Sequence, residues 1–397
     1  MNRHQLVFSF CGVKLALIRR RFSSVGGAEL YVQRLVRSLS DAGHELHFYT
    51  EQWDEPPAGT RVHRVSPAPS RALRAVSFAE QVDALLQQQR FDCVLSFERT
   101  LRQDVYRAGD GVHRAWLDQR RRFAPWYQKP FTRWGGFHRN MLALEAKTFD
   151  PGRTGRVIVN SEMVRREILQ FFAFPESRIH LVRNGIDVQR FQNGRRLETR
   201  KRFGFAEKDF VILFVGSGWE RKGLKYAMQA VDQFGVRQGL EILESEWTGE
   251  GQAPRRMAKT PVKLLVIGKG RIPFLTSKDF VFAGAMPDVE NAYAAADLFL
   301  FPPIYEPSAN VVFEAMAAGL PVISSVQNGS SELIIEGVNG TVVKNPSDVA
   351  RLVDAIAYWF SQRFMLRPVD SEQLRLERNV EETLKVLELA AADRRGR

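Results

Sequence analysis

Glu306 and Glu314 are two carboxylates that stand eight residues apart across a predicted junction between a loop and a helix. The apolar run 296–301 predicts a buried strand that stops at two prolines, and 310–318 predicts a helix that ends at Gly319. In a parallel sheet, such a loop lies at the carboxyl ends of the strands, where ligands bind. The two glutamates are therefore candidates to hold hydroxyl groups on either side of a bound anion.

The start of this predicted helix is itself suited to an anion. Free backbone N–H groups and the positive end of the helix dipole meet there, and Ser308 and Ala309 are small enough to let a phosphate approach. A glutamate in the first turns of a helix is favourable whatever the function. An ordinary helix is therefore the competing interpretation.

Arg221 and Lys222 form a second candidate site. The run 210–216 is almost wholly apolar, which is typical of a strand covered by helices on both faces, and the two basic residues follow in its loop. Arginine binds a diphosphate bidentately, and a neighbouring lysine adds a second positive charge. A solvated basic turn is the alternative.

Gly26 and Gly27 open a predicted amphipathic helix, where adjacent glycines let a ligand approach the backbone. The same pair is also an ordinary helix entry. It is not the spaced-glycine dinucleotide fingerprint, and the sequence has no Gly-Lys-Ser/Thr phosphate loop. Asp110 and His113 are candidates to line a cleft, although an aspartate beside glycine more often forms a turn and a lone histidine is more often structural.

Residues 113–148 combine basic and aromatic side chains with few acidic ones. The basic residues are Arg114, Arg120, Arg121, Arg122, Lys129, Arg133, Arg139 and Lys147, and the aromatic ones are Trp116, Phe123, Trp126, Tyr127, Phe131, Trp134 and Phe137. Arginine and lysine bind anionic head groups while tryptophan and tyrosine lie at the membrane boundary, so this mixture favours a membrane surface. Single-stranded nucleic acid and a solvated helical excursion are the alternatives.

Length and composition set the bounds. A chain of 397 residues with 44% hydrophobic content is long enough for two domains, and its net charge of +12 suits nucleic acids, anionic lipids and phosphorylated substrates alike. The two cysteines, Cys11 and Cys93, are too few for a disulfide framework and indicate a reducing compartment. Charges interrupt the first apolar run, and no run reaches the length of a membrane span, so we expect a soluble or peripheral protein.

Strands and helices alternate in two successive α/β series. We expect a first strand at 5–10, a linker in the polar run 189–201 and a loop between 238 and 260. The expected domains are 1–185, which carries the excursion 113–148, then 186–370, and a C-terminal helix in 371–397 that packs back toward the first domain.

Four motifs occur in the order seen in the retaining glycosyltransferases of family four, which the chain resembles over nearly its whole length. They are Gly26-Gly27-Ala28-Glu29, Asn184-Gly185-Ile186-Asp187, Gly216 with Arg221-Lys222-Gly223, and Glu306 through Glu314 to Pro321. The resemblance implies the GT-B fold, in which two Rossmann-like domains with parallel sheets face an interdomain cleft. Within the family, the chain is similar to the lipopolysaccharide core heptosyl α-1,3-glucosyltransferases, which also carry a basic-aromatic excursion.

The resemblance implies a role for each candidate residue. Arg221 and Lys222 would neutralise the donor diphosphate, Glu306 would contact the transferred hexose, Glu314 would hold the ribose, and Asp110 would be an active-site aspartate. Further donor contacts would come from Gly26, Gly27, Gly216, Ser308, Ala309, Asn310 and Val311. The role of His113 stays open because the family's cleft histidine stands in a different local context.

The implied activity is transfer of a hexose from a nucleotide sugar such as UDP-glucose to a membrane-associated saccharide such as the lipopolysaccharide core. The nucleotide sugar is a co-substrate and no further cofactor is expected. No Asp-x-Asp pair is present to hold a metal, so the reaction would be metal-independent. The enzyme would act at the cytoplasmic face of the inner membrane, without nucleic acid. A nucleotide-sugar epimerase of the same fold and an inactive basic protein that binds lipid or nucleic acid are the alternatives.

Overall fold

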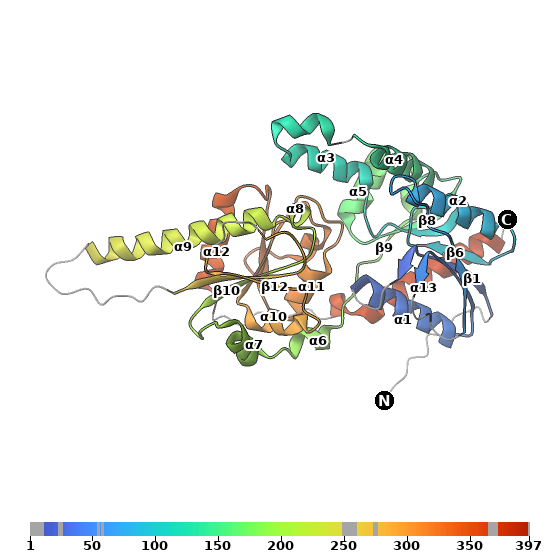
Figure 1. Cartoon of the computed structure of the whole chain (residues 1–397). Coiled ribbons are helices and arrows are strands. Elements are labelled where there is room, and N and C mark those ends of the chain that lie inside the picture. Colours follow the sequence, from blue (N-terminus) through green and yellow to red (C-terminus); the bar gives the residue numbers. More distant parts are fainter. Residues whose placement is uncertain are drawn as a thin grey trace. The chain divides into compact units, whose positions relative to one another are not determined.

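The structure is a computed structural model that describes residues 12–22, 27–53, 56, 59–132, 134–247, 260–272, 277–363 and 372–395, with the backbone alone for 27–30 and 239–247. The chain divides into two compact units (Figure 1). The first contains residues 1–185 and 376–397, and the second contains residues 186–375. The expected class, two α/β domains each built on a parallel sheet, is confirmed.

The first unit has a parallel sheet that, in the described part of the chain, consists of seven strands. Their spatial order is β5 (Thr60–Arg64), β3 (Glu45–Thr50), β1 (Lys14–Ile18), β6 (Cys93–Ser96), β7 (Gln103–Arg107), β8 (Thr154–Val159) and β9 (Ile179–Leu181). A parallel pair of short strands, β2 (Arg21–Phe22) and β4 (Gln52–Trp53), lies apart from it. The helices are α1 (Gly27–Asp41), α2 (Arg74–Leu86), α3 (His113–Phe123), η1 (Trp126–Phe131), α4 (Gly136–Thr148), α5 (Glu162–Phe171), η2 (Glu176–Arg178) and α13 (Leu376–Arg395).

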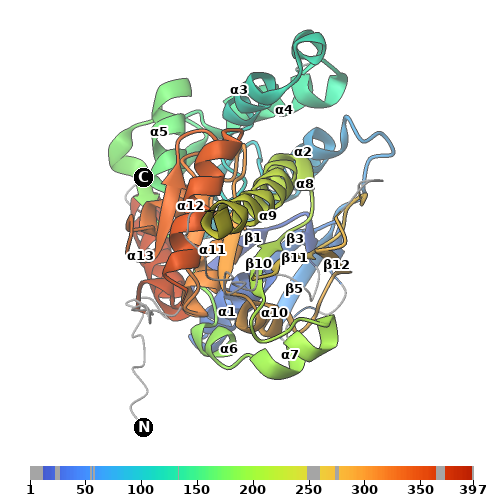
Figure 2. The ribbon, with the colours of Figure 1, turned by 90° about the vertical axis from the view of Figure 1, so that its left-hand side faces the viewer.

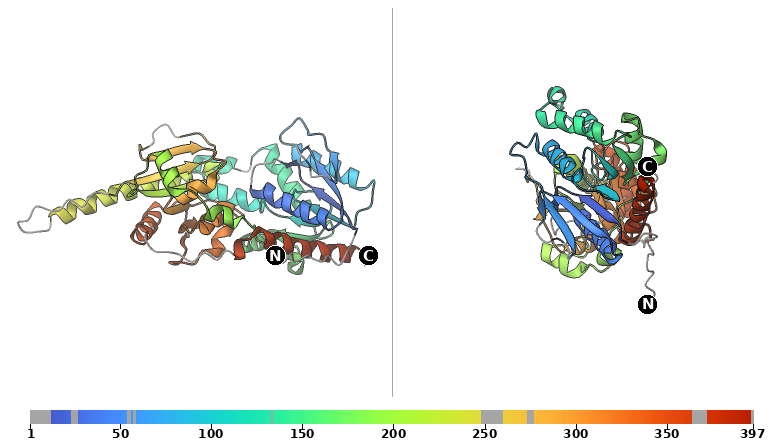
Figure 3. Two further views of the ribbon diagram at one scale, coloured as in Figure 1. Left: turned by 90° about the horizontal axis from the view of Figure 1, so that it is seen from below. Right: turned by 90° about the vertical axis from the view of Figure 1, so that its right-hand side faces the viewer.

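The helix α13 belongs to this first unit although it follows the whole second unit in sequence. It runs along the sheet, and its apolar side chains share one core with α1 and with β1, β3, β6 and β7 (Figure 3). Leu376, Val380, Leu384 and Leu387 are its most regularly spaced buried residues. The spacing of three or four residues places them on one face of the helix, which is why the helix packs on the sheet.

The strand expected at 5–10 lies outside the described residues, and the first strand in the structure is Lys14–Ile18. Lys14 and the arginines that follow the strand make this stretch polar at both ends, so its hydrophobic pattern does not indicate a strand. Lys14 is accommodated at the strand start, where its N–H donates to Asp92 Oδ2 at 2.8 Å and its Nζ donates to Gln89 at 3.1 Å. The four residues that follow Lys14 are buried.

The second unit has a parallel sheet of six described strands. Their order is β12 (Phe280–Gly284), β11 (Val262–Ile267), β10 (Phe210–Val215), β13 (Leu298–Phe301), β14 (Val322–Ser325) and β15 (Gly340–Val343). The helices are α6 (Val188–Gln192), α7 (Arg196–Phe203), α8 (Trp219–Lys222), α9 (Leu224–Trp247), α10 (Val289–Ala295), α11 (Asn310–Ala317), η3 (Gly329–Leu333), α12 (Val349–Ser361) and η4 (Glu372–Leu374). All six residues of β10 are buried, as expected for a strand covered on both faces.

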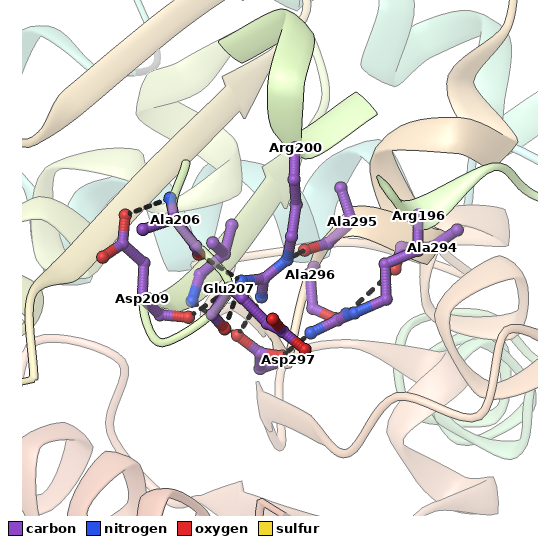
Figure 4. A network of polar contacts seen from close by, with 10 residues as sticks. Arg196, Arg200, Ala206, Glu207, Asp209, Ala294, Ala295, Ala296 and Asp297 are labelled. Carbon is purple, nitrogen blue, oxygen red and sulfur yellow. Dashed lines mark hydrogen bonds and ion pairs between the residues drawn. The ribbon is translucent and has the colours of Figure 1, made fainter. Parts of the chain in front are cut away.

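The expected linker at 189–201 is wrong, because these residues form α6 and most of α7 within the second unit. Arg200 explains their order (Figure 4). Its buried guanidinium donates to Asp297 Oδ2 at 2.7 Å and to the carbonyl oxygens of Ala295, Ala206, Glu207 and Asp209 at 2.8–3.1 Å. The polar run is therefore ordered because one arginine donates to five acceptors at the end of α10 and in the segments that lead into β10 and β13.

The first part of the loop expected between 238 and 260 is wrong, because α9 continues as a helix to Trp247. This helix lies beside α12 in the second unit (Figure 2). Phe234 of α9 packs against Phe360 with ring centroids 5.6 Å apart, and both contact Phe210. Residues 248–259, the remainder of the predicted loop, lie outside the described part of the chain.

The excursion 113–148 consists of α3, η1 and α4, which lie together on the first unit (Figure 1). Within the ranges that the structure describes, no helix combines the length and the apolar character needed to cross a bilayer.

Candidate functional site

Lys222 lies folded against the end of β10. Gly216, the residue after the strand, has a φ of 150°, and a Cβ added there would approach Lys222 Cδ to 2.7 Å. The Lys222 Nζ lies 5.7 Å from the centre of the Phe301 ring at the end of the neighbouring strand β13. Glycine at position 216 is therefore required both by its backbone angle and by the lysine that covers it.

The loops after β10 and β13 are tied together, since these strands are neighbours in the sheet. Arg221 Nη2 lies 3.2 Å from Glu306 Oε2, and the Ile304 N–H donates to the Arg221 carbonyl at 2.9 Å. Gly223 permits this approach, because a Cβ there would meet the Pro302 carbonyl oxygen at 1.8 Å. The arrangement brings the predicted residues Arg221, Lys222 and Glu306 into one cluster.

The turn between Glu306 and α11 is held by η3 and the residues before it. The Glu306 N–H donates to the Gln327 carbonyl at 2.8 Å, and the Gly329 N–H donates to the Glu306 carbonyl at 2.9 Å. The hydroxyls of Ser308 and Ser330 are 3.2 Å apart, and Ser330 Oγ donates to the Ala309 carbonyl at 3.1 Å. This turn is therefore a fixed element rather than a loose loop.

Residue Ala309 precedes α11 and supplies no side-chain cap to the helix start. Asn310 and Val311 are the first two residues of α11, and the first-turn Val312 N–H donates to the Ala309 carbonyl at 3.0 Å. Anion binding at this uncapped helix start stays a prediction.

Glu314 faces a different environment from Glu306. Tyr293 on α10 donates from its hydroxyl to Glu314 Oε2 at 2.7 Å. Burial raises the pKa of Glu314, while the Tyr293 hydrogen bond and the charges of Arg190 and Lys222 act in the opposite direction. Tyr293 and Arg190 were not predicted as site residues, because Tyr293 lies in an apolar helix and Arg190 in the supposed linker.

The four charged side chains act on one another electrostatically. Burial is the main cause that lowers the pKa of Lys222, and the neighbouring Arg221 adds to it, whereas Glu306 and Glu314 raise it. Two cations and two carboxylates therefore meet at the carboxyl edge of one sheet, where they can hold an anion together with hydroxyl groups. In the described residues, no group of three or more His, Cys, Asp or Glu side chains could hold a metal ion.

The candidates of the first unit are less concentrated. Gly26 lies outside the described residues, and Gly27 is the first residue of α1. Asp110 is exposed on the turn after β7, and this turn is held by Asn160, whose Nδ2 donates to the Gly109 carbonyl at 3.1 Å. The structure therefore places Asp110 at the carboxyl edge of the first sheet.

His113 has a structural setting. It begins α3, and its Nε2 lies 3.1 Å from His138 Nδ1 in a stacked pair. Burial, Arg99 and His138 lower the pKa of His113 to about 3, so the imidazole is neutral at neutral pH. Its ring hydrogen bond joins α3 to α4.

Glu145 is a buried carboxylate that sequence reasoning missed. It accepts from the N–H groups of His113 and Arg114 at 2.6 and 3.1 Å, and it pairs with Arg99 at 3.0 Å. It lies on α4, so it caps the start of α3 from a neighbouring helix. Because Arg99 lies 46 residues earlier in the chain, no local sequence motif predicts that Arg99 and Glu145 form an ion pair.

Two family models match the chain. The model "Glycosyltransferase Family 4" matches residues 25–190, and the model "Glycosyl transferases group 1" matches residues 209–362. The first match covers most of the first unit's sheet, and the second covers the loops that carry Arg221, Lys222, Glu306 and Glu314.

Named glycosyltransferases are among the relatives and structural neighbours. The lipopolysaccharide glucosyltransferase WaaG of Escherichia coli is 23% identical over 358 residues, which are 88% of each chain. An uncharacterized glycosyltransferase of Methanocaldococcus jannaschii is 26% identical over 366 residues, 87% of this chain and 89% of the relative. The crystal structure of WaaG has a TM-score of 0.69 at 21% identity and covers 96% of this chain and 98% of that one. Anabaena HepE in complex with UDP-glucose has a TM-score of 0.64 at 15% identity, covering 94% and 98%.

Proposed function

Because the chain belongs to glycosyltransferase family four and has the GT-B fold, we propose that it transfers a hexose from a nucleoside-diphosphate sugar to a membrane-associated saccharide. The transfer retains the configuration of the sugar and needs no metal ion. The observation that carries the proposal is the cluster of Arg221, Lys222, Glu306 and Glu314 at one sheet edge. The glucosyltransferase WaaG, related over most of both chains, supports the lipopolysaccharide core as the acceptor.

In this proposal, Arg221 and Lys222 bind the diphosphate and stabilise the negative charge that grows on it as the bond to the sugar breaks. Arg221 is paired with Glu306, and the two side chains are 38% and 12% exposed. The diphosphate replaces Glu306 as the partner of Arg221, because its two anionic groups offer the guanidinium more acceptors and more negative charge than one carboxylate does. Glu306 is then released toward the transferred hexose.

Glu314 binds the ribose hydroxyls, with Tyr293 fixing the orientation of its carboxylate. The turn of Ser308 and Ala309 and the start of α11 at Asn310 and Val311 receive the phosphate. Asp110 serves as the active-site aspartate of the first unit. Neither glutamate acts as a nucleophile, and the leaving phosphate takes the acceptor proton.

UDP-glucose is the proposed donor, since the neighbouring HepE structure is a complex with UDP-glucose. A thermal-shift and hydrolysis screen over nucleotide sugars tests this. A donor at 100 times its Kd stabilises the folded state by about 2.7 kcal/mol, so the correct compound should raise Tm by several degrees. If no nucleoside-diphosphate sugar raises Tm, the donor site is refuted. Release of a free epimerised sugar without acceptor would instead favour the epimerase.

The acceptor is proposed to be reached at an anionic membrane surface on the cytoplasmic side. The exposed residues of the excursion form a basic-aromatic surface, which we define as Arg121, Arg122, Trp126, Tyr127, Lys129, Phe131 and Trp134. Trp126 is 83% and Trp134 73% exposed, which is unusual for tryptophan unless a partner covers it. Arg120 is excluded because it donates to the Thr132 carbonyl and approaches His138 within its own unit.

Replacing Arg121, Arg122 and Lys129 with glutamate is expected to weaken binding to anionic vesicles by two orders of magnitude or more. Each basic residue near such a surface contributes roughly 1 kcal/mol, and reversal adds repulsion. Sedimentation with phosphatidylglycerol vesicles measures this. The matched control reverses the exposed lysines Lys201, Lys208 and Lys385, which gives the same net charge elsewhere. If both triple variants lost the same amount of vesicle binding, the overall charge and not this surface would explain the binding. If the wild-type protein sedimented equally with neutral and anionic vesicles, the electrostatic part of the proposal would be refuted.

A further inference from the structure

Arg107 is a buried cation for which the described side chains supply no counter-ion. It ends β7 with 6% of its surface exposed, and its guanidinium carbon lies 4.3 Å from the centre of the Tyr31 ring on α1. One nitrogen, Nη2, donates to Asn184 Oδ1 at 2.9 Å. The other, Nη1, is buried without a hydrogen-bond partner, and no carboxylate pairs with Arg107 among the side chains that the structure describes.

Asn160 is a second buried side chain with an unused polar atom. It follows β8 and is 2% exposed, and its Oδ1 has no hydrogen-bond partner within the described part of the chain. Its Nδ2 is already used, because it donates to the Gly109 carbonyl on the turn that carries Asp110. The open atom is therefore an acceptor, whereas the open atom of Arg107 is a charged donor.

The two side chains lie on the same face of the same sheet edge. Arg107 pairs with Ile158 in the parallel register of β7 and β8, and Asn160 is two residues beyond Ile158. Since side chains alternate between faces along a strand, Arg107, Ile158 and Asn160 share one face. Ile158 and Tyr31 belong to the core formed with α1 and α13, so this is the face that α1 covers.

A buried guanidinium is unfavourable unless an anion and hydrogen-bond acceptors compensate for its lost hydration. Asn184 and the Tyr31 ring compensate in part, but neither carries a negative charge. We propose that Arg107 and Asn160 form a subsite for an anionic saccharide, a sugar that bears a phosphate or carboxylate. Arg107 Nη1 donates to the anionic group, and Asn160 Oδ1 accepts from a neighbouring sugar hydroxyl.

This inference deepens the proposed function and rests on it in one respect, namely that the saccharide is the acceptor. Asn160 connects the subsite to the candidate aspartate, because it holds the turn of Gly109 and Asp110. An anionic group bound by Arg107 would therefore fix the acceptor beside Asp110. The donor cluster of Arg221 and Lys222 also binds anions, so the experiment must separate the two sites.

Asn184→Asp is the most selective test, because it puts a carboxylate at the atom that already accepts from Arg107. The variant supplies the missing counter-ion without changing side-chain size. We expect glucose 6-phosphate to bind at least tenfold more weakly by calorimetry, while Tm stays equal or rises. Arg107→Met should lose binding as well, and the exposed Asn193→Asp gives the same charge change as a matched control.

Lys222→Met separates this site from the donor site. It should lose nucleotide-sugar binding and keep glucose 6-phosphate binding, with the opposite pattern in Asn184→Asp. The subsite would be overturned if Asn184→Asp bound glucose 6-phosphate with unchanged affinity. It would also be overturned if only Lys222→Met lost glucose 6-phosphate binding. Inorganic phosphate that binds as tightly as glucose 6-phosphate would refute the saccharide part of the proposal. Glucuronate that binds as tightly would support the part that includes a sugar carboxylate. Absent nucleotide-sugar binding in the wild-type protein would refute the proposed function and leave the subsite standing.

Discussion

Lys222→Met is expected to lower kcat/KM for sugar transfer by about 10²–10³-fold, as removal of one preorganised charge from a transition state typically does. The Lys222 side chain is held against Gly216 and Phe301, and Glu306 and Glu314 are close enough to raise its pKa, so its position is fixed beside the two carboxylates. Burial lowers the pKa of Lys222, which shows that the charge is desolvated there. Methionine keeps the volume and removes this unfavourable burial, so Tm should not fall.

The exposed Lys225, three residues later on α9, provides the matched control. Lys225→Met should keep full activity, because that side chain lies in solvent. Gly216→Ala should behave like Lys222→Met, since the new Cβ would displace the lysine stem. If Lys222→Met transferred the sugar at the wild-type rate, measured with a donor that stabilises the fold, then Lys222 would not stabilise the negative charge on the leaving diphosphate.

The site of the second unit follows from a topological rule and was therefore predictable. The loops after β10 and β13 had to meet because neighbouring parallel strands end at the same edge, and this brings Arg221 and Lys222 to Glu306. Residues that lie far apart and share no such rule were missed. Tyr293 beside Glu314 is one case, since nothing in an apolar helix marks the residue that will donate a hydrogen bond.

The fold errors have a similar cause. The linker prediction assumed that a polar run stays in solvent. Arg200 is buried, however, because it donates to Asp297, which lies 97 residues later in the chain. The strand Lys14–Ile18 was missed because Lys14 looks like an interruption until Asp92 and Gln89 accept its hydrogen bonds. In each case, a charged residue takes part in regular structure because hydrogen-bond partners far along the chain accept from it, and hydrophobic periodicity does not detect such partners.

Glu145→Leu is expected to destabilise the first unit by about 3–5 kcal/mol, the usual cost of removing one partner from a buried ion pair. Arg99 would stay buried without its carboxylate, and the N–H groups of His113 and Arg114 would lose their acceptor. Hydrogen exchange should therefore accelerate most in α3. Nucleotide-sugar binding should persist, because Arg221, Lys222, Glu306 and Glu314 belong to the other unit.

The exposed Glu176→Leu serves as control, since it removes the same charge without a buried partner. The double variant Arg99→Met/Glu145→Leu should recover part of the lost stability, because it removes the orphaned charge as well. Equal exchange in α3 for wild type and Glu145→Leu would contradict the capping role.

The same substitution tests whether the excursion must be folded to bind membrane. The basic-aromatic surface is presented by α3, η1 and Trp134, which precedes α4, and Glu145 joins α4 to the first residues of α3. If the surface binds only as a folded unit, Glu145→Leu should weaken vesicle binding although every basic and aromatic residue of the surface is retained. If charge and aromatic content are sufficient, vesicle binding should stay at the wild-type level while α3 exchanges faster. The two outcomes separate a preformed docking surface from a segment that orders on the bilayer, where the ordering cost would reduce the affinity.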